Sequence, residues 1–158
     1  MSDIKNEPNF QLGKRHYVLC GDEAGMKRLN GIKESLTNQS LSFEEIHLFH
    51  ECSPEVDIHL GKQKIGTYLY AAAEWNTLKE VVFLAKKLGY SSEEAQFIGV
   101  GEKEKRVFCC RCHFISNLRS PLHTGDQMSC SACGMKLELS DHYSPIKEAY
   151  LGYVAHIE

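Results

Sequence analysis

The sequence FCCRCHFISNLRSPLHTGDQMSCSACGMKLEL, residues 108–139, decides the fold of the last third of the chain. It contains five of the seven cysteines, and four of them form two C-x-x-C pairs, Cys109 with Cys112 and Cys130 with Cys133. Each pair directs two sulfurs toward one point, and the 17 residues between Cys112 and Cys130 are enough to bring the pairs together. This spacing is typical of a zinc ribbon, in which four thiolates bind one ion.

Three further side chains in this stretch are possible metal ligands. Cys110 could replace Cys109 only by shortening the turn to C-x-C, so we expect that it binds no metal. His113 and His123 are spare donors, and we expect them to be ordinary surface histidines because four thiolates are already present.

The identity of the metal stays open between zinc and iron, since a four-thiolate site holds either. In rubredoxin-type iron sites, glycine usually follows the second cysteine of each pair. Gly134 fits that pattern and His113 does not. The stretch therefore favours structural zinc, which would also supply folding energy to a module too small for a large core of its own.

The overall composition is that of an ordinary globular protein. The chain has 158 residues, 42% of them hydrophobic and 25% charged, with a net charge of -3. No apolar run approaches the ~18 residues of a membrane span. The polar first residues lack the apolar segment of a signal peptide. We expect a cytoplasmic protein, in which paired cysteines are more often ligands than disulfides.

Nucleic acid is a weak candidate partner. From Cys109 to Leu139 the basic residues exceed the acidic ones by one charge, and a phosphate-binding face would need more. We therefore expect neither a nucleic-acid nor a membrane partner.

The first two thirds of the chain alternate between strand and helix patterns. Short β-rich runs are expected at 16–20, 46–49, 66–71 and 96–100. Apolar stripes at helical spacing are expected at 26–36 and 75–88, and 50–64 read as a loop. This order indicates an α/β fold, a small parallel sheet with crossover helices of reduced Rossmann-like form. The expected domains are a flexible arm at 1–14, an α/β domain at 15–101, a zinc ribbon at 102–141 and a closing helical segment at 142–158.

The closing segment has the signals of a helix. Ser144 is a good N-cap and Pro145 suits the first helical position. Apolar side chains then recur at helical spacing, at Ile146, Ala149, Tyr150, Tyr153, Val154 and Ile157.

The second half resembles the small A subunit of bacterial dimethylamine monooxygenases. The matching residues are Arg106-Val107-Phe108-Cys109, Cys112, Cys130-Ser131-Ala132-Cys133-Gly134, Asp141-His142-Tyr143-Ser144 and Ala149-Tyr150-Leu151-Gly152. The double C-x-x-C is common, and its combination with the closing segment is much more specific. The family usually has two basic residues after the serine, where this chain has Pro145-Ile146.

Residues 15–101 resemble a reduced nicotinamide-binding domain of ferredoxin reductases. The likeness is greatest from Gly66 to Val100, with its strand, turn, helix ending in Leu-Gly and acidic turn. Where such reductases have Cys-Gly-Pro, this chain has Ala71-Ala72-Ala73. Only Cys20-Gly21-Asp22 and Gly25 echo a glycine loop. We therefore expect the fold without its cofactor.

The resemblance implies an accessory subunit of a multi-component, NADPH- and oxygen-dependent enzyme that demethylates dimethylamine to methylamine and formaldehyde. It implies haem, flavin and an iron–sulfur cluster on partner chains, namely a haem subunit, a reductase and a folate-binding subunit. This chain shows no catalytic constellation, so we predict no catalytic and no cofactor-binding residue in it. His142, Tyr143, Ser144 and Tyr150 of the closing motif are candidate interface residues.

Two other functions stay open. The first is a rubredoxin-like electron carrier with iron at Cys109, Cys112, Cys130 and Cys133. The second is a zinc-ribbon adaptor in nucleic-acid metabolism, which salt-dependent binding to DNA or RNA would reveal.

Overall fold

The computed structural model describes residues 4–49, 54–118 and 122–155. These residues form two compact units, Met1–Gly101 and Glu102–Glu158, each with its own sheet.

The first unit is built on a parallel sheet of five strands in the order β1-β5-β4-β2-β3. Every neighbouring pair is parallel. The strands are β1 (Ile4–Lys5), β2 (His16–Gly21), β3 (Phe43–His47), β4 (Thr67–Glu74) and β5 (Ala95–Val100). The central strands are buried on both faces, as parallel strands covered by crossover helices must be. The predicted α/β class is confirmed.

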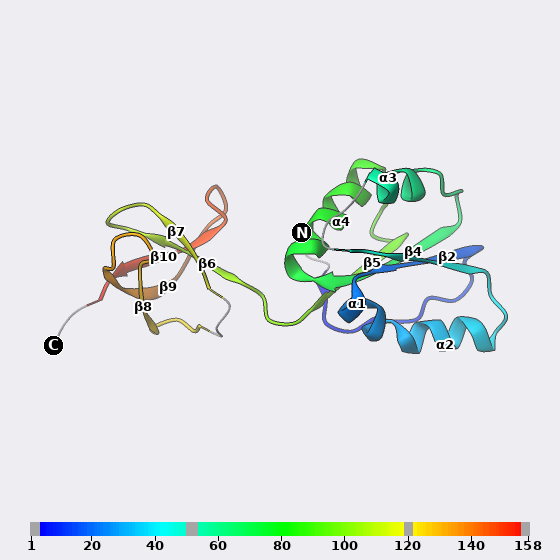
Figure 1. Ribbon diagram of the computed structural model, residues 1–158, viewed down its shortest axis with the longest axis horizontal. Coiled ribbons are helices and arrows are strands. Elements are labelled where there is room, and N and C mark those ends of the chain that lie inside the picture. Colours follow the sequence, from blue (N-terminus) through cyan, green and yellow to red (C-terminus); the bar gives the residue numbers. More distant parts are fainter. Residues whose placement is uncertain (1–3, 50–53, 119–121, 156–158) are drawn as a thin grey trace. The chain divides into compact units, whose positions relative to one another are not determined.

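Helices cover both faces of this sheet (Figure 1). They are α1 (Glu23–Arg28), α2 (Asn30–Asn38), α3 (Pro54–Gly61) and α4 (Trp75–Lys87). α2 packs on the face that carries Tyr17 and Leu19. α3 and α4 pack on the opposite face, against Val18 and Cys20, because successive strand residues point to opposite sides.

One helix was missed in the sequence. The segment 50–64 read as a loop, but its described part contains α3, whose buried residues are Val56 and Leu60. Two apolar residues four positions apart are too short a stripe to predict a helix, and Ile58 between them is exposed. Residues 50–53 lie outside the described part of the chain.

The predicted flexible arm is instead attached to the sheet from residue 4 onward. β1 adds a parallel strand beside β5. The Gln96 side chain accepts from Asn9 N at 2.9 Å and donates to Asn9 O at 2.6 Å. The Tyr70 hydroxyl accepts from Gln11 N at 2.8 Å. Buried side chains that bond the backbone of a polar segment leave no signal in that segment's own sequence.

The second unit is a mixed sheet in the order β7-β6-β10-β9-β8. Its strands are β6 (Lys105–Cys109), β7 (Ile115–Leu118), β8 (Gln127–Ser129), β9 (Lys136–Ser144) and β10 (Ala149–Val154). β10 is parallel to β6 and antiparallel to β9, and the remaining pairs are antiparallel.

The predicted closing helix is wrong. Ser144 Oγ does accept from Lys147 N at 3.3 Å, as a helix cap would, but the chain turns and enters β10. β10 is a central strand, and a Cβ on Gly152 would lie 2.8 Å from the Val107 side chain. The glycine, tyrosines and valine of β10 suit a strand that pairs with β6 on one side and β9 on the other. The spacing of the apolar residues alone had indicated a helix. Residues 156–158 lie outside the described part.

In the described part of the chain, no helix has the length and apolar character needed to cross a membrane.

Candidate metal centre

The two C-x-x-C pairs occupy equivalent places in two hairpins. Residues 109–114 join β6 to β7 and are called the first turn, and residues 130–135 join β8 to β9 and are called the second turn. Each turn thus lies at the tip of an antiparallel strand pair.

The first turn closes with two backbone hydrogen bonds. Cys109 N donates to Phe114 O at 2.9 Å, and His113 N donates to Cys109 O at 2.8 Å. His113 has a φ of 66°, in the left-handed region that few residues other than glycine adopt. Its ring stacks on Phe108 at 5.2 Å between ring centres.

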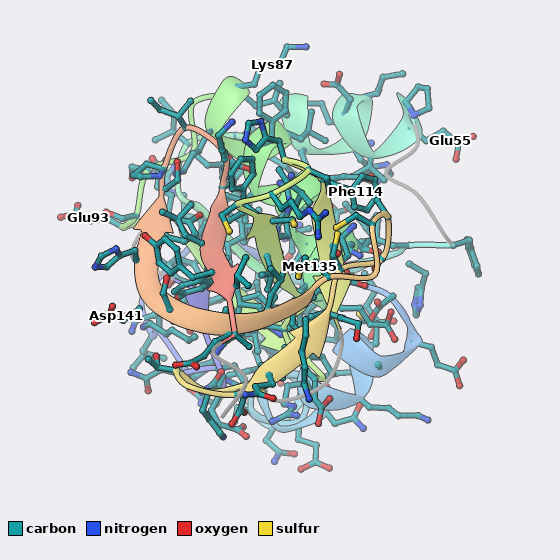
Figure 2. The ribbon with its side chains drawn as sticks, turned by 90° about the vertical axis from the view of Figure 1, so that its left-hand side faces the viewer. Glu55, Lys87, Glu93, Phe114, Met135 and Asp141 are labelled. Carbon is teal, nitrogen blue, oxygen red and sulfur yellow. The ribbon has the colours of Figure 1, made fainter. Side chains whose placement is uncertain are left out.

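The second turn repeats this pattern. Cys130 N donates to Met135 O and Gly134 N donates to Cys130 O, both at 2.9 Å. Gly134 has a φ of 73°. Figure 2 labels Phe114 and Met135, the residues that end the two turns, and draws sulfur in yellow. His113 thus occupies in the first turn the position that Gly134 occupies in the second, with the same left-handed backbone conformation.

The four cysteine sulfurs come together between the turns. They all lie within 4.8 Å of one another. The Cys109 and Cys133 sulfurs are 3.8 Å apart, and those of Cys112 and Cys130 are 3.5 Å apart. Four sulfurs about 2.3 Å from one ion in a tetrahedron are separated by about 3.8 Å. The residues therefore fit a four-coordinate zinc or iron ion.

The protein surroundings favour a thiolate at Cys130. Backbone N–H groups of Cys133 and Ala132 lower the pKa of the Cys130 thiol to about 6. Cys109 and Cys130 are buried, whereas Cys112 and Cys133 are exposed. Since thiolates and not thiols are metal ligands, this lowering of the Cys130 pKa favours metal binding.

The other candidate donors lie outside the sulfur group. Among the described residues, the four cysteines are the one group that could hold a metal ion, and Cys110 is not part of it. Cys110 N instead donates to Gly152 O at 3.1 Å, which ties the first turn to β10. His123 is exposed, and its backbone N–H donates to the Asp126 carboxylate at 2.8 Å.

A buried serine that the sequence did not single out connects the two hairpins. Ser116 on β7 is 1% exposed, and its Oγ accepts from Ser131 N, in the second turn, at 3.2 Å. A single serine in a strand carries no sequence signal for such a role.

Very little apolar packing supports the sulfur group. The buried cluster at the centre consists of Cys109, Cys130 and Leu137, with Met128 and Met135 packed against it. So small a core supplies little folding free energy, which is the situation in which a bound metal stabilises a module most.

The candidate interface residues of the closing segment lie on β9 and β10. His142 Nδ1 is 3.2 Å from the Tyr153 hydroxyl, and Tyr143 meets Tyr150 edge-to-face at 5.1 Å between ring centres. Ser144 caps the turn that follows β9. Tyr143 is 51% exposed. In Figure 2 the labelled Asp141, beside them in sequence, points away from the sulfur atoms. The four residues lie outside the sulfur group; His142 and Tyr143 are exposed, and Ser144 and Tyr150 are partly buried.

Two solved structures resemble the chain in its backbone arrangement. The first is described as "phthalate dioxygenase reductase: a modular structure for electron transfer from pyridine nucleotides to [2Fe-2S]", with 10% identity over 72% of this chain and 47% of that chain and a TM-score of 0.49. The second is full-length CYP116B46 from Tepidiphilus thermophilus, with 11% identity over 70% of this chain and 19% of that chain and a TM-score of 0.44. The chain thus spans less than half of either protein. No curated protein sequence matches it.

Residues 106–153 match a protein family described as dimethylamine monooxygenase subunit DmmA-like, C-terminal domain. The matched segment runs from the second residue of β6 to the last but one of β10 and includes all four cysteines of the sulfur group. The resemblance seen in the cysteine module and the closing motif is therefore confirmed: this segment is similar to the C-terminal domain of the DmmA-like subunits of dimethylamine monooxygenase.

Proposed function

We propose that this chain is an accessory subunit of a multi-component dimethylamine monooxygenase, which uses NADPH and oxygen to convert dimethylamine to methylamine and formaldehyde. The observation that carries the proposal is the family match over residues 106–153. The sulfur group and the closing motif, from Asp141 to Gly152, both belong to that match, so the part of the chain with a candidate site is also the part with the family likeness.

In this proposal the metal is structural zinc. Cys109, Cys112, Cys130 and Cys133 would hold it, and it would join the two hairpins of a sheet with a very small core. Zinc with four protein ligands has no open coordination position and no redox chemistry, so it would supply folding energy and no reaction step.

The chain would act through its surfaces. We propose that the segment around His142, Tyr143, Ser144 and Tyr150 docks on partner chains of the same complex, a haem subunit, a reductase and a folate-binding subunit. These partners would carry haem, flavin and an iron–sulfur cluster. Exposed tyrosines support a docking role, because they bury a large area on binding at small entropic cost. The cytoplasm suits such thiolate ligands.

An iron-containing electron carrier is the second candidate. His113 adopts the left-handed conformation of Gly134, so a histidine after Cys112 permits the same turn that glycine provides. The presence of His113 in place of glycine is therefore no argument against iron at this site.

The test is to purify the tagged chain at native expression from its own host grown on a methylated amine. We expect haem and flavin absorption to co-elute with it, and a colourless protein with one zinc per chain when it is expressed alone. Colour that stays with the isolated chain and bleaches on reduction would establish the electron carrier instead. Purification without haem or flavin bands would contradict the subunit proposal.

Docking is tested by the same purification with variants. Tyr143→Ala should reduce the co-eluting haem and flavin at least about fivefold, the loss of a contact worth about 1 kcal/mol. Phe83→Ala is the matched control, since Phe83 is an exposed aromatic on α4 of the other unit. Equal recovery with both variants would exclude docking through Tyr143.

A further inference from the structure

The parallel sheet of the first unit has the crevice at which such folds bind ligands. The chain passes from β2 to β3 on one side and then to β4 on the other, so the order reverses between β2 and β4. Ligands of open parallel sheets bind outside the carboxyl ends of the strands at such a point. A cleft of about 1360 Å³ lies there, lined by Asp22, Glu74 and Val100 among others.

The sequence resemblance of residues 15–101 to reductase domains would imply a nicotinamide dinucleotide in this cleft, with its pyrophosphate at the start of the helix after β2. That place is taken by the chain's own carboxylate. Asp22 caps α1, and one of its oxygens accepts from Gly25 N at 2.7 Å. Its other oxygen accepts from Glu74 N, at the end of β4, at 2.9 Å. Asp22, which lines the cleft, thus bridges α1 and β4 by accepting from one backbone N–H group of each element.

Gly21 and Gly25, which resemble the glycines of a phosphate-binding loop, have a different structural role here. A Cβ on Gly25 would lie 1.6 Å from Ala72 O, and a Cβ on Gly21 would lie 2.4 Å from the same oxygen. Gly25 is needed because α1 packs directly on the backbone of β4, whereas Gly21 ends β2, the strand that pairs with β4 beside the same carbonyl. In dinucleotide-binding loops a glycine lets the backbone approach phosphate, whereas here it lets the helix approach a protein carbonyl.

The cations around the cleft are also engaged. Lys33 contacts Glu45 at 2.8 Å, and Lys27 contacts Glu23 at 3.6 Å. A phosphate in the cleft would therefore lie near the Asp22 carboxylate and would have to compete with acidic side chains for each lysine. Like charges at such distances repel.

We infer that the Asp22 carboxylate seals this cleft against phosphate groups, so that the first unit binds no nicotinamide dinucleotide there. The same carboxylate forms a structural joint between α1 and β4. This inference stands independently of the proposed function, because it uses residues of the first unit alone.

The direct test follows the two amides that Asp22 binds. NADPH and NADH are added separately to the full ¹⁵N-labelled chain up to about 1 mM, the upper end of common KM values. We expect the amide signals of Gly25 and Glu74 to stay in place. Saturable shifts of either signal, or of other residues that line the cleft, would overturn the inference, whereas shifts confined to residues outside the cleft lining would support it.

A pair of variants tests the bridge itself. Asp22→Asn keeps one acceptor oxygen, so it retains at most one of the two bonds, and its melting temperature should fall by about 5 °C. Glu23→Gln is the matched control, because Glu23 is the adjacent carboxylate and is 90% exposed. Loss of the Glu23 charge and of its ion pair with Lys27 should shift the melting temperature by no more than about 2 °C. Melting is followed by the fluorescence of Trp75, the chain's one tryptophan. Equal shifts for the two variants would show that Asp22 forms no bridge.

Discussion

At the scale of single residues, the four clustered cysteines and Cys110 differ in what their removal should do. Cys112→Ala or Cys130→Ala removes a donor from the sulfur group, and three thiolates bind zinc far more weakly than four. We expect each variant to lose its metal and to become sensitive to protease over residues 102–155. Metal content by elemental analysis and limited proteolysis are the readouts.

Cys110→Ala is the control for this series. Its backbone N–H, which bonds Gly152 O, is unaffected by the substitution. The variant should retain one metal per chain. Loss of metal from Cys110→Ala equal to that from the other two would refute the ligand set.

A second prediction concerns backbone conformation in the second turn. Gly134→Ala places a Cβ on a residue with a φ of 73°, although no neighbouring atom lies within 4 Å. The cost is conformational alone, about 1 kcal/mol of unfolding free energy. The thermal transition of the metal-loaded second unit, followed by circular dichroism, should therefore move to lower temperature.

The matched control is Gly31→Ala on α2. Gly31 also has open space around it, but its φ is not in the left-handed region. Alanine should stabilise this helix by about 0.5–1 kcal/mol. The same chemical change should thus have opposite signs at the two positions, and a stabilising Gly134→Ala would contradict the assigned turn conformation.

At the scale of elements, the hydrogen bond between β7 and the second turn should stabilise the metal centre. Ser116→Ala leaves the N–H of Ser131 without its acceptor, which costs about 1–2 kcal/mol. We expect faster amide exchange at Ser131 and faster transfer of metal to a chelator. Ser129→Ala, at an exposed position on β8, should change neither. Unchanged exchange at Ser131 would exclude this connection.

Elements with long apolar stripes were predictable from the sequence, and short ones were not. α4 has four buried residues at helical spacing, and Gly89 ends it with a φ of 92°. α3 has only two buried residues at helical spacing, which is too few to distinguish a helix from a loop by sequence. The closing segment had a helical spacing of apolar residues, but Gly152 is required where β10 crosses Val107 and Leu137. That requirement comes from neighbours far away in sequence.

The candidate site was predictable to a similar extent. Metal ligands in a C-x-x-C turn are set by local spacing, so the four cysteines could be identified and the structure brings their sulfurs together. The roles of Ser116 and Asp22 depend on partners 15 and 52 residues away. No local pattern in the sequence identifies such partners.

At the scale of the whole molecule, each of the two units has its own core, so loss of metal should affect them differently. The first unit has two large buried clusters, on the two faces of its sheet. The second has a small one around two cysteines. We expect chelation to unfold the second unit and to leave the first folded.

Trp75 makes this prediction simple to check, because it lies in the first unit. Its fluorescence transition should be the same with and without metal. The amide signals of β9 and β10 should collapse to unfolded positions when metal is removed. A Trp75 transition that moves with metal content would show that the two units unfold together.

The matching turns of the two hairpins also have a consequence for how an ion is captured. Each turn is closed by hydrogen bonds among its own six residues, so either hairpin offers two sulfurs before the other hairpin is in place. The second pair then binds intramolecularly, at the effective concentration set by a 17-residue tether. Capture and release are accordingly stepwise. A competing chelator can take over one pair of positions while the other pair still holds the ion, so the rate of metal exchange should rise with the concentration of the acceptor.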